Sequence, residues 1–217
     1  EWKIKFMNLK DNKVSNWIYH KRTYIYAFFI PAILLFLVYA AFEYYPFGNN
    51  SVLVLDLNGQ YVYYYESMRD AFWGDGSMLY SWSRILGGEM VGIFGYYLAS
   101  PFSLIVMLFP RTMILEGILV MQLFKVGAAG VTFAYYLRRS KRTSDYTTLI
   151  FSTLYALMAY AVVQLMDPMW LDGLIYLPLI IFGTEKLIDE GKKLQFIIPL
   201  ALMFIANFYI GWMVGFF

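Results

Sequence analysis

Long apolar runs recur along the chain at residues 24–42, 113–137, 146–166, 174–188 and 194–217. A helix of about 20 apolar residues crosses the ~30 Å hydrocarbon core of a bilayer. The pattern therefore predicts an all-α fold: a polytopic bundle of transmembrane helices that forms a single domain over residues 1–217. The last run is still apolar where the sequence stops, and we expect this chain to be the N-terminal part of a longer protein.

The polar residues between these runs predict an orientation. Residues 44–112 are rich in tyrosine, tryptophan and carboxylates, and their only basic residues are Arg69, Arg84 and Arg111. Most of the 17 lysines and arginines lie instead before residue 24, at 138–142 or at 186–193. Because cytoplasmic loops carry the excess of Lys and Arg, we predict a cytoplasmic N-terminus and extracytoplasmic loops at about 44–112 and 167–173.

One further apolar segment, residues 98–109, is too short to be a typical span. It contains Pro101 and is followed by Pro110. Counting it as a span would also place the basic cluster at 138–142 outside. We therefore predict a re-entrant or interfacial segment.

Composition narrows the chemistry. Hydrophobic residues make up 60% of the chain and charged residues 15%, which is too little charge to coat a soluble domain. The net charge of +2 gives no indication of a nucleic-acid partner. With no cysteine and only His20, thiolate chemistry and multi-histidine metal sites are excluded, so any catalysis has to use carboxylates, amides, hydroxyls, aromatic rings, lysine or arginine.

In the first loop, residues 58–73 have the spacing of an amphipathic helix. One side carries Tyr61, Tyr64, Tyr65, Met68 and Phe72, and the other carries Gln60, Ser67 and Asp70. This spacing predicts a helix lying flat at the membrane interface. Asp56 precedes this helix. It either caps the helix or acts as a catalytic carboxylate that takes a proton from an acceptor hydroxyl, with Gln60 one turn away.

The glycine-bearing stretch 81–90 has no nucleotide-binding pattern. In a functional interpretation Arg84 binds a donor phosphate and Trp82 stacks on a sugar ring; the alternatives are a surface ion pair and an interfacial anchor. In the second outer loop, Trp170 and Asp172 have the same two interpretations. Trp170 stacks on a sugar or anchors, and Asp172 supplies a second carboxylate beside Asp56 or caps the next helix.

Several sequence blocks resemble, in order, those of the YfhO family of bacterial membrane proteins. They are Asp56-Leu57-Asn58-Gly59-Gln60-Tyr61, Ser81-Trp82-Ser83 with Gly87-Gly88, Tyr96-Tyr97-Leu98-Ala99-Ser100-Pro101-Phe102, Met169-Trp170-Leu171-Asp172-Gly173 and Asn207-Phe208-Tyr209-Ile210-Gly211. The blocks span nearly the whole chain, although the family is much longer.

This resemblance implies a GT-C type glycosyltransferase of the bacterial cell membrane, with a catalytic aspartate early in its first outer loop. The matching residue here is Asp56. The implied donor is a polyprenyl-phosphate sugar, and the implied acceptor is a cell-wall polymer such as teichoic acid. A divalent metal held by Asp56 and a second carboxylate is compatible with the pattern but not required by it. The sugar, the polymer and the oligomeric state stay open.

Two alternatives stay open beside this enzyme. Glu116, Gln122 and Lys125 lie within a predicted span, and polar groups at membrane depth often mark a transport pathway, which is the basis for a transporter or lipid flippase. Glu116 and Lys125 are too far apart on one helix to pair, so each needs another partner. A scaffold whose aromatic loop docks an enzyme is the third hypothesis.

Overall fold

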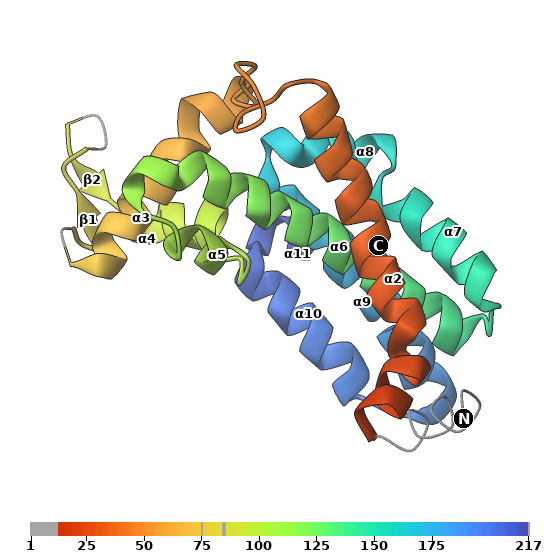
Figure 1. Ribbon diagram of the computed structural model, residues 1–217. Coiled ribbons are helices and arrows are strands. Elements are labelled where there is room, and N and C mark those ends of the chain that lie inside the picture. The colour runs from red at the N-terminus through yellow and green to blue at the C-terminus, as the bar shows by residue number, and fades with distance from the viewer. Residues whose placement is uncertain (1–12, 75, 84–85, 217) are drawn as a thin grey trace.

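The computed structural model describes residues 13–74, 76–83 and 86–216 (Figure 1). The predicted all-α fold is confirmed. The α-helices are α2 (Lys13–Ala41), α3 (Val62–Trp73), α4 (Val91–Ile93), α5 (Ser103–Met107), α6 (Ile114–Ser140), α7 (Asp145–Ala156), α8 (Ala159–Val163), α9 (Leu171–Glu190), α10 (Leu194–Ala206) and α11 (Phe208–Phe216). Shorter helical turns are η1 (Leu57–Tyr61), η2 (Phe94–Leu98), η3 (Arg111–Met113), η4 (Gln164–Met166) and η5 (Pro168–Trp170).

Helix α6 forms the centre of the bundle, and it packs against α2, α7 and α9, while α10 packs against α9 (Figure 1). Two glycines permit the closest crossings. A Cβ on Gly130 of α6 would lie 2.2 Å from the Ala27 carbonyl oxygen of α2, and one on Gly183 of α9 would lie 2.2 Å from the Gln195 carbonyl oxygen of α10. Both crossings therefore depend on the absence of a side chain.

The loop helix begins at Leu57 as a π-helical turn and continues as α3. Its predicted apolar face is present. Tyr61 and Tyr65 of this face are buried in a core cluster together with Ile118 and Met121 of α6, so these two rings pack against protein. The position of the helix relative to the membrane surface stays a prediction.

Residues 98–109 form no span-length helix. Helix α5 is five residues long and follows a turn at Pro101. Side chains of the α3 region tie this segment in place: Arg69 donates to the Phe109 carbonyl oxygen at 2.8 Å and Trp73 to the Met107 carbonyl oxygen at 3.0 Å. The stretch after α3 forms a hairpin of strands β1 (Tyr80–Ser81) and β2 (Gly88–Glu89), paired antiparallel with Tyr80 opposite Glu89.

Among the residues that the structure describes, two helical stretches have the length and composition to cross a membrane, Lys21–Ala41 and Arg111–Ser140; a third candidate is α7 with α8 and η4, bent by 42°. The last apolar run is not one helix, because it breaks at Asn207 between α10 and α11. The Asn207 side chain accepts from the Ile210 amide and donates to the Tyr96 carbonyl oxygen, both at 2.8 Å. The number of spans stays a prediction.

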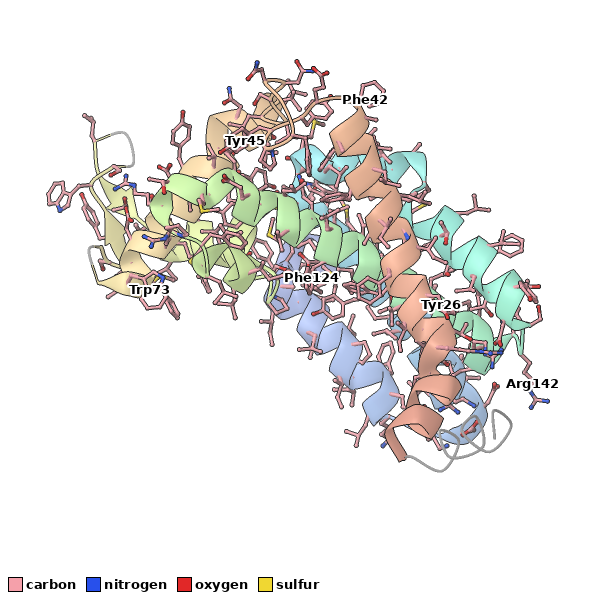
Figure 2. The ribbon with its side chains drawn as sticks, in the orientation of Figure 1. Tyr26, Phe42, Tyr45, Trp73, Phe124 and Arg142 are labelled. Atoms are coloured by element: carbon pink, nitrogen blue, oxygen red, sulfur yellow. The ribbon has the colours of Figure 1, made fainter. Side chains whose placement is uncertain are left out.

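The tyrosine-rich loop and the basic turn lie at different ends of the bundle. Figure 2 shows Trp73, beside the hairpin, and Arg142, after α6, at opposite ends of the molecule. The loop with the tyrosine-rich helix and the basic turn between α6 and α7 are thus separated by the length of α6.

Candidate functional site

Asp56 lies exposed at the start of the loop helix, and it does not cap that helix. Its own φ and ψ of −66° and −29° are helical, whereas a capping residue has an extended backbone that lets its side chain reach forward. The capping interpretation is therefore wrong for Asp56. The preceding residue, Leu55, has a φ of 46°, a left-handed conformation that non-glycine residues rarely adopt.

Gln60 and Tyr97 hold the Asp56 side chain in position. The Gln60 Nε2 donates to Asp56 Oδ1 at 3.1 Å, and the Tyr97 hydroxyl donates to Gln60 Oε1 at 2.8 Å. The Tyr97 ring in turn packs edge-on against Tyr61 and Tyr96, with ring centroids 5.3 and 4.7 Å apart. A chain of packed rings and hydrogen bonds thus orients one exposed carboxylate.

A second carboxylate, Asp167, lies beside Asp56. Partial burial raises the pKa of Asp167, and the charge of Asp56 and a hydrogen bond shared with it raise the pKa further. Asp167 follows η4 and precedes Pro168, so it comes from the second predicted outer loop. The sequence predicts that this loop lies next to Asp56, with Asp172 as its carboxylate; in the structure the carboxylate beside Asp56 is Asp167. Asp167 occupies the N-cap position of η5, but its side chain makes no capping hydrogen bond.

Asp172 lies about one turn after Asp167, and its carboxylate is buried in an ion pair rather than exposed beside Asp56. Its side chain has no exposed surface, and it accepts from Lys125 Nζ at 2.6 Å and from Ser100 Oγ at 2.8 Å. Lys125 also donates to the Pro168 carbonyl oxygen at 2.8 Å. This buried pair connects α6, α9 and the turn after Tyr97, and it fixes the backbone next to Asp167.

The polar residues of α6 have the partners that the sequence required. Besides the Lys125 pair, Gln122 accepts from the Tyr39 hydroxyl at 3.0 Å and donates to the Leu165 carbonyl oxygen at 2.7 Å. Glu116 Oε1 accepts from the Tyr45 hydroxyl at 2.7 Å.

A family model described as "Bacterial membrane protein YfhO" matches residues 27–217. The chain belongs to the YfhO family. No curated protein and no solved structure matches the chain. The matched range contains the whole of the Asp56 site.

Four of the five sequence blocks that carry the YfhO resemblance meet one another in the fold. Gln60 of the first block bonds Tyr97 of the third, Ser100 of the third bonds Asp172 of the fourth, and Asn207 of the fifth bonds the Tyr96 carbonyl oxygen. These four blocks therefore form one connected structure that includes Asp56, although they are distant in sequence.

The other predicted site residues of this YfhO-family chain are placed as follows. Trp82 is 81% exposed on the hairpin, with its ring 5.0 Å from Tyr80. Trp170 is half-buried, edge-on to Tyr209 at 6.0 Å. Arg84, predicted to bind a donor phosphate, lies outside the described residues. Within the described part of the chain no group of three His, Asp or Glu residues is arranged to hold a metal, and the predicted divalent ion stays a prediction.

Proposed function

We propose that this chain forms part of a membrane glycosyltransferase that transfers a sugar from a polyprenyl-phosphate donor to an extracytoplasmic cell-wall polymer such as teichoic acid. Asp56 is the general base. It takes the proton of an acceptor hydroxyl while that oxygen attacks the anomeric carbon. The bond from the anomeric carbon to the phosphate oxygen breaks, and polyprenyl phosphate leaves.

The proposal rests mainly on the environment of Asp56. Its carboxylate is exposed and makes no helix-capping hydrogen bond, Gln60 donates a hydrogen bond to it, and Asp167 lies beside it. A general base needs a free oxygen and a fixed orientation within reach of the proton that it takes. Asp56 has an exposed carboxylate, and Gln60 fixes its orientation. Beside it, partial burial and the charge of Asp56 raise the pKa of Asp167.

Changing Asp56 to Asn in the full-length protein tests the proposal in cells. Asparagine keeps the shape and the bond from Gln60 but cannot take a proton, so we expect glycosylation of the cell-wall polymer to fall by about 10²–10⁴-fold at unchanged protein level. Asp189→Asn is the matched control, because Asp189 is exposed near the far end of α9. Glycosylation that persists in the Asp56 variant would favour the scaffold hypothesis.

The transporter alternative has one observation in its favour. Glu116 Oε2 is buried and lacks a hydrogen-bond partner among the described residues. A carboxylate oxygen of this kind within a predicted span can bind a transported cation. Lys125 and Gln122, in contrast, are fully engaged with the protein. The two functions differ in energy source: an enzyme turns over a polyprenyl-phosphate sugar without any ion gradient, and a transporter does not.

A further inference from the structure

An apolar groove lies between three helices of the bundle. It has a volume of about 300 Å³, and it is lined by Tyr135 of α6, by Leu179 and Phe182 of α9, and by residues 194–195 and 198–199 at the start of α10. Leu194 and Ile198 leave 68% and 53% of their surface exposed, so the described part of the chain does not cover this wall. We call it the α10 groove.

The α10 groove lies at the basic end of the bundle. Lys193 directly precedes Leu194, and Arg139 follows Tyr135 by about one turn of α6. An ion pair of 2.9 Å between Lys141 and Glu185 holds this end of α6 to α9. Because the charge rule predicts that this end faces the cytoplasm, we expect the groove at the depth of the lipid acyl chains, next to the cytoplasmic headgroups.

Two cations lie at the rim of the α10 groove, over its own aromatic rings. The guanidinium carbon of Arg139 is 5.7 Å from the ring centroid of Tyr135, and Lys186 Nζ is 5.7 Å from that of Phe182. Both rings line the groove. An aromatic face attracts a cation, which keeps both charged groups at the rim. A guanidinium has five N–H donors, so Arg139 can bind an anion while it contacts the ring.

The rim keeps positive charge after its ion pairs are counted. Lys186 and Lys192 share one carboxylate, that of Glu190. Arg139 and Lys193 are exposed, and neither forms an ion pair with a described residue. Two cations beside the groove are therefore available to a ligand.

The whole basic end has the same sign of charge. Residues 21–22, 138–145 and 185–193 contain nine lysines and arginines and four carboxylates. Residues 1–20 add four lysines and two carboxylates. The excess is therefore positive with or without residues 1–20, and it favours an anionic ligand at a membrane surface.

An anionic phospholipid matches both parts of this surface. Its acyl chain needs no hydrogen bonds and fits the apolar wall, and its phosphate pairs with arginine and lysine. A zwitterionic headgroup adds a cation, which this rim repels.

We propose that the α10 groove binds an anionic phospholipid of the cytoplasmic leaflet, with an acyl chain in the groove and the phosphate at Arg139 and Lys193. The site is independent of the proposed sugar transfer, because the length of α6 separates the basic end from the tyrosine-rich loop.

Lipid binding to the full-length protein in detergent tests the proposal. Native mass spectrometry measures the Kd of two phospholipids with the same oleoyl chains, anionic phosphatidylglycerol and zwitterionic phosphatidylcholine. We expect phosphatidylglycerol to bind at least several-fold more tightly. Arg139→Gln combined with Lys193→Gln should raise its Kd roughly tenfold and remove most of this preference, because both unpaired cations are lost.

Two further variants make the test specific. Arg142→Gln is the matched control, because Arg142 is exposed at the same basic end but does not line the groove, and it should leave both Kd values unchanged. Ile198→Trp fills the apolar wall and should weaken the binding of both lipids. Because Ile198 is half exposed, this variant should fold, and its thermal midpoint checks that it does.

A soluble probe separates the headgroup from the chains. Glycerol phosphate carries the anion without an acyl chain, and it should not displace phosphatidylglycerol at equal concentration. Displacement by glycerol phosphate, equal Kd values for the two phospholipids, or an equal loss of binding in Arg142→Gln and in the double variant would each overturn the proposal. Absence of lipid binding would also overturn it, and would indicate that another part of the full-length protein covers the groove.

Discussion

Among single residues, Asp167 decides how the Asp56 site responds to pH. Burial, the charge of Asp56 and a shared hydrogen bond all raise the pKa of Asp167 above its ordinary value of 3.8. A carboxyl whose pKa is raised by folding binds its proton more tightly in the folded state. Its ionisation therefore costs stability, and this cost appears as the pH rises from the unfolded pKa through the folded one.

Because folding raises the pKa of Asp167, stability should decrease as this carboxyl ionises. The thermal midpoint of the full-length wild-type protein should fall as the pH rises from about 3.8 across the titration of Asp167, and Asp167→Asn should remove this part of the fall. Thermal unfolding in detergent at a series of pH values measures it. Asp189→Asn is the control for loss of one exposed carboxylate. Parallel curves for Asp167→Asn and wild type would mean that the carboxyl pair is not coupled.

At the scale of helices and their contacts, the buried Lys125–Asp172 pair joins α6 to α9. Removing one partner of a buried pair leaves an uncompensated charge, which costs about 3–5 kcal/mol, whereas replacing both partners by apolar residues costs much less. Lys125→Met should therefore lower the free energy of unfolding by about this amount, and Lys125→Met with Asp172→Leu should recover most of the loss. Denaturation of all variants in one detergent measures the difference. A double variant as unstable as the single one would show that the pair contributes by packing.

The crossing of α2 and α6 gives a second prediction at this scale. Gly130→Ala places a Cβ against the Ala27 carbonyl oxygen and forces the two helices apart, so we expect a loss of about 1–3 kcal/mol. Gly215→Ala in α11 meets only Phe204 at ordinary contact distance and should be neutral or slightly stabilising. Equal stabilities for the two variants in the same unfolding assay would contradict the close crossing.

The elements show where sequence reasoning succeeded and where it stopped. Apolar length and helical spacing located the loop helix at residues 58–73 within one residue of its start, because these are local properties. They could not show that Tyr61 and Tyr65 turn into the protein, since that depends on the surface of α6. For the same reason Lys125 was known to need a partner, but Asp172 could not be named. Choosing between Asp167 and Asp172 required tertiary contacts that no spacing rule contains.

For the whole molecule, the separation of the tyrosine-rich loop from the basic turn agrees with the predicted topology. Trp73 and Arg142 lie at opposite ends (Figure 2), and the charge rule puts the end with Arg142 in the cytoplasm. These 217 residues contain no cysteine, so single cysteines at Ser77 and Ser140 report the two sides of the membrane in an otherwise cysteine-free protein. An impermeant thiol reagent applied to intact cells should label position 77 and spare position 140. Labelling of position 140 but not of position 77 would show the opposite orientation, with Asp56 on the cytoplasmic side.

The central claim is that Asp56 is the base of a sugar transfer that needs no gradient. Its most direct test is the rate at which purified full-length protein transfers sugar from a polyprenyl phosphate to a cell-wall polymer in detergent, where no gradient exists. The account predicts turnover by the wild type and by Asp189→Asn, and a rate lower by about 10²–10⁴-fold for Asp56→Asn. Transfer by Asp56→Asn at the wild-type rate would contradict it.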